Sequence, residues 1–193
     1  MREVPPQIAE RLPAAAELFA ERGLNDTKIE DVAAATGVAK ATLYYYFAGK
    51  EEILAFLLED VLRQIASEVR ATVGRKGSGA ERLHAVVGAQ LRLMAQRPAV
   101  CRALIGELGR AGRMPVVADM ITAAYLEPVE TLLLEGAADG SLVEVDNARA
   151  AAIALFGAVT ISALTYLITD DALDEDLVAR TIHNVVFVGL LPR

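Results

Sequence analysis

The sequence predicts an all-α protein, and three observations carry this expectation. Apolar residues recur at spacings of three and four along most of the chain, which is the period of an amphipathic helix. No stretch of useful length alternates apolar and polar residues as a half-buried strand would. Hydrophobic residues make up 54% of the 193 residues, and alanine, the best helix former, is abundant among them. These features favour a globular helical bundle.

The composition excludes several classes of protein. With 54% hydrophobic and 23% charged residues, the chain is too apolar to be disordered and too charged to cross a membrane many times. A net charge of −7 is the wrong sign for a protein that wraps nucleic acid without sequence preference. The single cysteine, Cys101, excludes an internal disulfide, and charged residues interrupt the first 20 positions where a signal peptide needs an apolar run. We therefore expect a cytoplasmic protein.

The N-terminal segment predicts two helices in succession. An apolar stripe over residues 12–20 ends at Gly23, a residue type that commonly ends helices. Thr27 and Glu30 have the spacing of a capping box, in which each side chain bonds to the other residue's backbone N–H. We therefore expect a short helix that starts at Thr27 and ends at Gly37.

A further short helix over residues 38–47 follows Gly37 directly and completes a helix-turn-helix. The second helix of such a pair fits the major groove of DNA. The side chains expected to reach bases or phosphates are Lys40, Thr42, Tyr44, Tyr45, Tyr46 and Lys50. The alternative is a small three-helix cap whose tyrosines merely cover the core.

The remaining chain predicts a second helical region. Breakers rich in glycine, proline or aspartate separate its apolar segments. The expected helices cover residues 50–72, 80–96, 99–111, 116–138, 147–169 and 173–191. Pro128 is expected to kink the helix that contains it.

A specific motif runs through residues 12–55. Its members are Leu18-Phe19-Ala20-Glu21-Arg22-Gly23, Thr27, Ile29, Val32-Ala33, Thr36-Gly37-Val38 and Thr42-Leu43-Tyr44-Tyr45-Tyr46-Phe47-Ala48-Gly49-Lys50-Glu51. This motif resembles the DNA-binding domain of the tetracycline-repressor-like (TetR) regulators. The resemblance implies that Thr27 and Lys28 contact the DNA backbone and that Lys50 anchors it. It also implies a helical ligand-binding and dimerisation domain downstream.

Some positions depart from the family pattern. Ala39 stands where the family usually has a serine that could cap the second short helix. Tyr46 stands where histidine is frequent, which changes the donor at an expected phosphate contact. Arg11 and Pro13 interrupt the usual apolar start of the opening helix.

The middle of the chain indicates a small-molecule site. Polar and sulfur-containing residues interrupt otherwise apolar helices, a mixture typical of ligand cavities. The candidate ligand-binding residues are His84, Met94, Cys101, Glu107, Met120 and Tyr125. The alternative is that they are core fillers and solvated charges. Because no metal-ligand cluster and no catalytic arrangement is recognisable, we expect no metal, no cofactor and no enzymatic activity.

Residues 150–168 form an uncharged stretch long enough to cross a bilayer. Small residues are common in it, however, and no basic cluster flanks it. A helix that pairs with the last apolar helix and with a second copy of the chain explains the pattern better. The candidate dimer residues are Ala154, Gly157, Ala158, Ile161, Ile182 and Val186. We expect a homodimer and no membrane partner.

Combined, these features predict a helix-turn-helix domain at residues 1–49 and an effector-binding and dimerisation domain at 50–193. The predicted function is a ligand-responsive, sequence-specific transcriptional regulator. It would be a repressor that a small apolar or amphipathic effector releases from an inverted-repeat operator in double-stranded DNA. A helical interaction or membrane-associated protein that does not use the DNA-binding face is the alternative.

Overall fold

The computed structural model describes residues 3–108, 115–170 and 173–192, without the side chains of residues 104–108 and 115–117. This described part contains helices, turns and bends but no β-strand, so the all-α prediction is confirmed. The chain divides into two compact units. The first comprises Met1–Val61 with Arg97–Val117, and the second comprises Leu62–Gln96 with Ala118–Arg193. The functional boundary expected after residue 49 stays a prediction.

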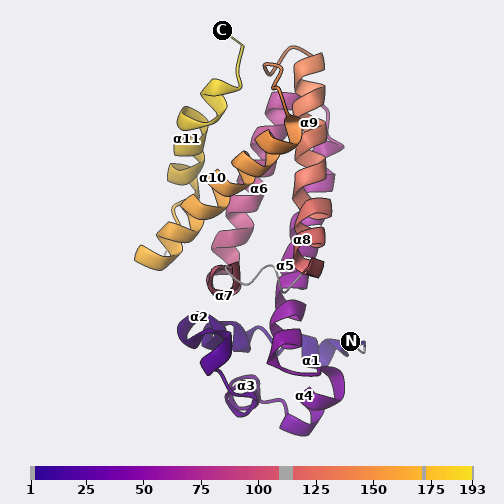
Figure 1. The fold of residues 1–193 in the computed structure, drawn as a ribbon, viewed down its shortest axis with the longest axis vertical. Coiled ribbons are helices and arrows are strands. Elements are labelled where there is room, and N and C mark those ends of the chain that lie inside the picture. The colour runs from indigo at the N-terminus through magenta and orange to yellow at the C-terminus, as the bar shows by residue number, and fades with distance from the viewer. Residues whose placement is uncertain (1–2, 109–114, 171–172, 193) are drawn as a thin grey trace. The chain divides into compact units, whose positions relative to one another are not determined.

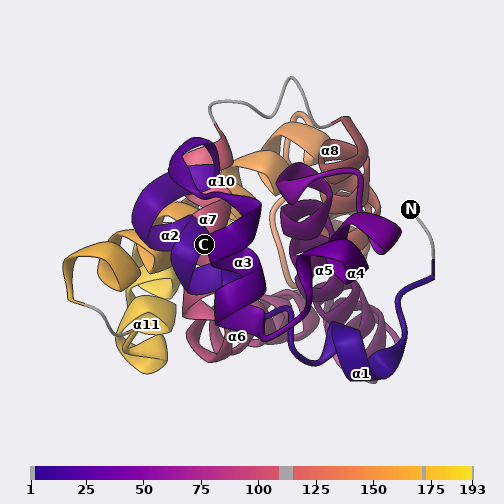
Figure 2. The same ribbon diagram turned by 90° about the horizontal axis from the view of Figure 1, so that it is seen from below.

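The first unit contains the predicted helix-turn-helix (Figures 1 and 2). Its helices are α1 (Pro6–Ala9), α2 (Ala14–Asp26), α3 (Ile29–Thr36), α4 (Lys40–Tyr46), the first part of α5 (Lys50–Val73) and α7 (Pro98–Leu108). Helix α2 packs against both α3 and α7. The core beneath α3 and α4 includes Leu12, Phe19, Val32, Leu43 and Phe47, none more than 2% exposed.

Helix α2 largely follows the expectation from sequence. It begins directly after Pro13, whose fixed φ suits a helix start. Gly23 has φ +74° and interrupts the helix at the predicted residue, and a last helical turn then runs to Asp26. The short helix α1, which begins at Pro6, was not predicted.

The predicted capping box is wrong by one residue. Lys28 is the N-cap of α3, and its backbone N–H donates to Oδ2 of Asp31 at 3.1 Å. Thr27 is fully buried, and its hydroxyl donates to the Gly23 carbonyl oxygen at 2.8 Å. The physical reason is that α2 ends with free carbonyl groups, which offer the buried Thr27 hydroxyl an acceptor.

The turn between α3 and α4 depends on Gly37. This residue adopts the left-handed conformation, with φ +62°, and ends α3 as predicted. A Cβ added here would lie 2.5 Å from Nη2 of Arg11, so the guanidinium group lies directly over the turn. The hydroxyl of Thr36 accepts from the N–H of Val38 at 3.3 Å. At the start of α4, Ala39 provides no side-chain cap, as expected.

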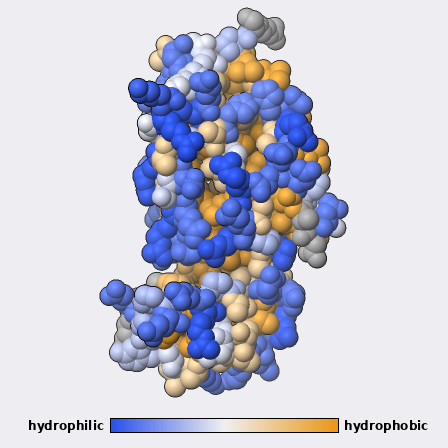
Figure 3. Space-filling view, turned by 180° about the vertical axis from the view of Figure 1, so that it is seen from behind, coloured by the Kyte–Doolittle hydropathy of each residue, from blue (hydrophilic) through white to orange (hydrophobic). Residues whose placement is uncertain are grey.

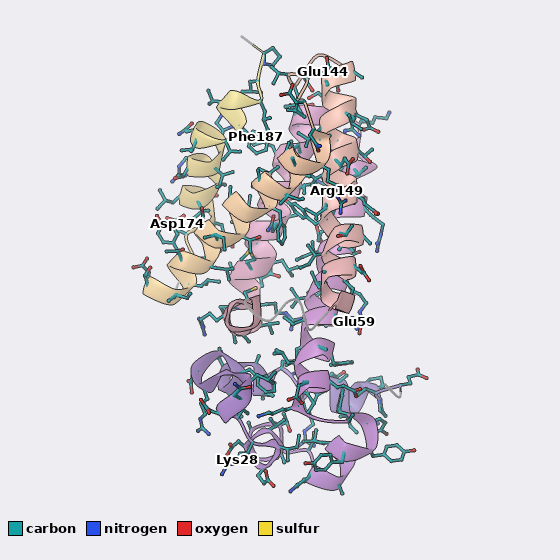
Figure 4. All side chains as sticks on the ribbon, viewed as in Figure 1. Lys28, Glu59, Glu144, Arg149, Asp174 and Phe187 are labelled. Carbon is teal, nitrogen blue, oxygen red and sulfur yellow. The ribbon has the colours of Figure 1, made fainter. Side chains whose placement is uncertain are left out.

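The second unit is a helical bundle. It contains the rest of α5, α6 (Gly79–Gln96), most of α8 (Pro115–Ile121), the π-helical segment η2 (Thr122–Leu126), α9 (Glu127–Ala138), α10 (Ala148–Thr169), α11 (Glu175–Val185) and the 3-10 turn η3 (Phe187–Gly189). Helix α6 packs against α9, α10 and α11, and α10 also packs against η2, α9 and α11. Asn147 caps α10, and Asp174 caps α11 (Figure 4). The last helix is shorter than the predicted 173–191.

The π-helical segment η2 lies directly before Pro128, the residue at which a kink was predicted, and the kink itself stays a prediction. Proline has no N–H, so Pro128 cannot donate to the carbonyl one turn earlier. The neighbouring Glu127 N–H bonds to the Thr122 oxygen five residues back, which widens this turn. Such segments are rare and frequently occur at functional sites. This one carries Tyr125, whose side chain is 1% exposed.

Candidate DNA-binding surface and effector site

Helix α4 has two faces of opposite character. Leu43 is fully buried, as is Phe47 just beyond the helix. On the other face, the side chains of Tyr44 and Tyr45 are 52% and 59% exposed, and Lys40 is also exposed. Large aromatic rings are normally buried. This exposed aromatic and basic face therefore offers hydroxyl and ammonium donors to a partner.

Lys40 has an acidic neighbour on α3. Its ammonium group forms an ion pair with Glu30 and lies 5.8 Å from the centre of the Tyr44 ring. This pair lowers the pKa of Glu30 and raises that of Lys40, chiefly through their mutual hydrogen bond. Both groups are fully solvated, so water screens their attraction. A phosphate could therefore replace the carboxylate as the partner of Lys40.

Lys28 lies exposed at the start of α3, at the edge of a hollow of about 340 Å³ (Figure 4). Tyr44 and the loop from Ala48 to Lys50 line the same hollow, together with the acidic Glu30 and Glu51. The hollow brings together four of the predicted DNA-binding residues, which are Thr27, Lys28, Tyr44 and Lys50.

Thr27 and Lys50 have internal roles that the sequence did not predict. The Lys50 ammonium group donates to the backbone oxygens of Asn25 and Thr27, at 2.7 and 2.8 Å. A positive charge at these carbonyls stabilises the end of α2. Because Thr27 is buried and Lys50 is half-buried and bonded to the backbone, the structure does not present either as an exposed phosphate donor.

Two further predicted DNA-binding residues, Thr42 and Tyr46, are half-buried on α4. The Tyr46 ring lies edge-on to Tyr45, with 4.9 Å between the ring centres. This contact orients the more exposed Tyr45 ring.

The structure scatters the residues predicted for the effector site. Met94 is buried on α6, and Cys101 is buried in the first unit, where burial raises the pKa of its thiol to about 12. Glu107 has its side chain outside the described residues. Met120 and Tyr125 both lie in the segment formed by α8 and η2.

His84 is exposed and belongs to a small aromatic cluster. Its Nε2 lies 2.7 Å from Nδ1 of His183, and its ring centre lies 4.1 Å from that of Phe187. Desolvation and the neighbouring His183 lower the pKa of His84. These contacts join α6 to α11 and to η3, which carries Phe187 (Figure 4). His84 is therefore part of the packing of the second unit and does not lie in an internal cavity.

An apolar groove lies between α5 and the segment formed by α8 and η2. Its volume is about 160 Å³, and it is lined by Leu62, Arg63, Ala66, Arg70, Met120, Ala123 and Ala124. Arg63 and Arg70 are exposed, and neither has an ion-pair partner among the described residues. Seven residues on a helix span about 10 Å. The groove therefore combines an apolar floor with two separated positive charges.

Deeper in the same unit, two buried polar groups lack hydrogen-bond partners within the described part of the chain. These are Oε1 of Gln90 and the hydroxyl of Tyr125. The amide N–H of Gln90 donates to the hydroxyl of Thr160 at 2.8 Å, and the Tyr125 ring lies 5.1 Å from that of Phe156. An unsatisfied buried polar group costs about 1–3 kcal/mol of stability. Such groups call for a functional explanation.

Sequence reasoning missed Arg63, Arg70 and Gln90. A signal for Gln90 was present, because it occupies a helical core position between the buried residues Val86 and Met94. The two arginines gave no such signal, since exposed arginines are common on helices.

The predicted dimer residues lie mostly at the surface of α10 and α11. Ala154 and Ile161 are exposed, and Gly157, Ala158 and Val186 are half-buried. Ile182 is only 4% exposed and packs within its own chain, so its role at a dimer interface stays a prediction that this burial does not favour. Further exposed apolar side chains on this surface are Ile153, Ile168, Leu177, Val185 and Val188. Figure 3 shows hydrophobic residues at the surface among hydrophilic ones.

The short helices α3 and α4, the tight turn at Gly37 and the exposed polar face of α4 define a helix-turn-helix protein that binds DNA. Residues 12–56 match the family model described as bacterial regulatory proteins, tetR family. This match identifies residues 12–56 as the DNA-binding domain of a tetR-family transcriptional regulator, which confirms the resemblance found in the sequence. The family and the relatives described next are regulators and not enzymes.

Comparison with known proteins extends this likeness to the whole chain. The Fatty acid metabolism regulator protein of Bacillus subtilis (strain 168) is 24% identical over 191 residues, which cover 98% of each chain. The HTH-type transcriptional repressor KstR2 of Mycolicibacterium smegmatis is 29% identical over 72% of this chain and 71% of its own. The structure of FadR from Bacillus subtilis in complex with stearoyl-CoA has a TM-score of 0.77 and 23% identity, covering 95% of this chain and 97% of that one.

Proposed function

We propose that this regulator is a dimeric repressor that binds an inverted-repeat operator in the cytoplasm and leaves it when a long-chain acyl-CoA binds the second unit. The observation that carries the DNA-binding part is the exposed face of α4, with Lys40, Tyr44 and Tyr45 beside the glycine turn. On this proposal Lys40, Thr42 and the tyrosines meet base edges or phosphates, and Lys28 meets the backbone.

The exposed apolar residues of α10 and α11 support a dimer. Ile161 on α10 and Val185 on α11 are 53% and 75% exposed, which favours burial against a second copy. Two-fold symmetry would then place two copies of α4 on half-sites separated by about one turn of DNA or a multiple of it.

Helix α10 also raises the alternative of a membrane protein. It is long and apolar enough to cross a bilayer by length and composition, and 39% of its most apolar window is buried inside the protein. The hydrogen bond between Gln90 and Thr160 lies on its buried side. Asn147 caps its N-terminus from within the fold. A helix that already packs against η2, α9, α6 and α11 favours the dimer over a membrane span.

The acyl-CoA class is supported by the fatty acid regulators among the relatives and by the groove. The Bacillus subtilis relative is named for fatty acid metabolism, and FadR from the same organism was solved with stearoyl-CoA. The groove between α5 and η2 offers an apolar floor for a chain and two arginines for phosphates. Helix α5 begins directly after the helix-turn-helix and continues along this groove. On this proposal, a ligand that displaces α5 alters the position of the helix-turn-helix domain. Release requires that the ligand bind the DNA-free state more tightly.

The test begins with selection of DNA fragments by the full-length protein, followed by binding measurements with and without stearoyl-CoA. We expect fragments with dyad symmetry and at least tenfold weaker binding when stearoyl-CoA is present. Selected sites without dyad symmetry would contradict the proposal that the protein binds DNA as a dimer. Unchanged DNA affinity in saturating stearoyl-CoA would contradict the proposed effector class, and partition of the purified chain into vesicles without DNA binding would favour the membrane alternative.

A further inference from the structure

The two histidines of the chain meet in the second unit although 99 positions separate them. Nε2 of His84 on α6 lies 2.7 Å from Nδ1 of His183 on α11. The sequence contains no other histidine, and its one cysteine, Cys101, is buried in the first unit. All imidazole groups of this protein are therefore gathered at one place. Spacing along the chain, on which the expectation of no metal depended, does not reveal this pair.

The ring of His84 is held in one orientation. The carbonyl oxygen of Ala80, one turn earlier on α6, accepts a hydrogen bond from this ring. Since Nε2 faces His183, the bond to Ala80 comes from Nδ1, and the neutral ring then carries its free lone pair on Nε2. Histidines that bind metals are oriented in the same way, because a bond from one ring nitrogen to a carbonyl makes the other nitrogen the ligand.

We propose that His84 and His183 form a binding site for a divalent transition-metal ion of the zinc, nickel and copper class. The ion binds Nε2 of His84 and Nδ1 of His183 in place of the proton that these nitrogens share in the ligand-free protein. His183 exchanges this proton with water and carries it on Nε2 when the ion is bound, so both ligand nitrogens are neutral. Imidazole suits this class of ion, whereas magnesium and calcium prefer oxygen ligands.

The geometry of the pair requires only a small adjustment. A Zn–N distance of about 2.0–2.1 Å and a tetrahedral angle place two ligand nitrogens about 3.4 Å apart. The two nitrogens, now 2.7 Å apart, must therefore separate by less than about 1 Å. His84 is exposed, so water can occupy the remaining coordination positions.

The number of protein ligands defines the kind of site. The described part of the chain contains no group of three or more histidine, cysteine, aspartate or glutamate residues that could hold a metal ion. Structural zinc sites usually have four protein ligands, and catalytic sites have three. Two histidines completed by water instead form an exchangeable site, which fills and empties with the concentration of free ion. When it is filled, the ion connects α6 to α11 and stabilises the second unit.

A role in packing alone is the alternative. The ring centres of His84 and His183 lie 4.1 and 6.2 Å from that of Phe187, so the three rings form one cluster. Such a cluster predicts no response to zinc. The proposal predicts that zinc raises the melting temperature of the wild type, and that it does so in neither His84→Gln nor His183→Gln.

Calorimetry on the full-length protein without a polyhistidine tag measures the affinity, with ZnCl₂ and MgCl₂ as probes. We expect one zinc ion per chain and no binding of magnesium. His84→Gln and His183→Gln should each weaken zinc binding by at least about tenfold, because loss of even an outer partner of a ligand has an effect of this size. Glu144→Gln, which removes an exposed carboxylate outside both helices, is the control and should bind zinc as the wild type does.

NMR of the imidazole rings gives a second measurement that needs no variant. Zinc, and not magnesium, should shift the ring signals of both histidines in the wild type. Unchanged ring signals at saturating zinc would overturn the proposal, as would equal zinc affinity in the wild type and in both histidine variants. Melting curves without zinc identify any loss of affinity that results from unfolding, and the NMR measurement on the wild type then decides.

Discussion

Lys40 and Lys50 carry the same charge in the first unit but have partners of different kinds. Lys40 pairs with the carboxylate of Glu30 in full solvent, and Lys50 bonds to backbone oxygens at the end of α2. An exposed carboxylate is a weak and exchangeable partner, whereas the carbonyls at a helix end remain in place. The two lysines therefore predict different effects when they are replaced.

Lys40→Ala should weaken operator binding and reduce base preference. The variant loses an ammonium group on the face of α4 that we place in the major groove, so the salt dependence of binding should fall by about one unit of slope. Titrations of operator and scrambled DNA at several salt concentrations measure both effects. Glu30→Gln, which frees Lys40 and removes a negative charge, should strengthen binding to both DNAs. An unchanged salt slope in Lys40→Ala would show that this lysine does not meet phosphate or base.

Lys50→Met should instead lower the stability of the first unit. It removes two hydrogen bonds to the end of α2, and we expect the free energy of unfolding to fall by about 1 kcal/mol. Urea titration followed by circular dichroism measures the change. Lys40→Ala is the control, because its free energy of unfolding should equal that of the wild type. Lys50→Met could instead keep full stability, bind DNA more weakly and show a salt slope smaller by about one unit. That result would show that Lys50 binds a phosphate.

At the scale of elements, the turn between α3 and α4 sets how the second helix leaves the first. Gly37 adopts φ +62° under the guanidinium of Arg11. Gly37→Ala should lower the free energy of unfolding by about 1–2 kcal/mol, because an L-residue is strained in this conformation and its Cβ would displace Arg11. Gly37→Asn should lose less stability, since asparagine tolerates the left-handed region. Equal losses in the two variants would show that contact with Arg11, and not backbone strain, dominates.

The groove between α5 and η2 makes a second prediction at this scale. Replacement of both Arg63 and Arg70 by glutamine should weaken stearoyl-CoA binding about tenfold or more at low salt and reduce its salt dependence, because both cations are expected to meet phosphates. The affinity for free stearate, which carries no phosphate, should change little. Arg180→Gln, on α11 outside the groove, serves as the control. Equal losses for stearate and stearoyl-CoA would place the phosphates elsewhere.

At the scale of the whole molecule, DNA binding is expected to depend on a surface far from α4 in sequence. Ile161→Arg should give a monomer on sedimentation and reduce operator affinity at least a hundredfold, because a charge would be buried without a counter-charge at the dimer contact. The residue is 53% exposed in the single chain, so the fold itself should persist. Leu134→Arg on α9, where the side chain is 58% exposed, should remain dimeric and bind normally. A dimeric Ile161→Arg protein would place the interface elsewhere.

Much of this protein follows from local features of its sequence. The all-α class, the breaks at Gly23 and Gly37 and the helix-turn-helix motif each depend on residues within a few positions of one another. Hydrophobic period, turn chemistry and backbone preference act at this range, so a single sequence determines them. The exposed positions of Lys40, Tyr44 and Tyr45 follow from the same helical period once Leu43 is assigned to the core.

Only the tertiary structure decided which polar groups face inward and which of them meet. Thr27 and Lys50 form hydrogen bonds with backbone oxygens at the end of α2, and Ile182 is buried in the core of its own chain. The sequence alone predicted Thr27 and Lys50 at the DNA surface and Ile182 at the dimer surface. Gln90 bonds to Thr160 and Tyr125 packs against Phe156, so each meets a residue of α10 that lies far from it in the chain. Such outcomes depend on contacts between elements far apart in sequence. Burial and hydrogen-bond satisfaction are properties of the packed structure, which local patterns do not encode.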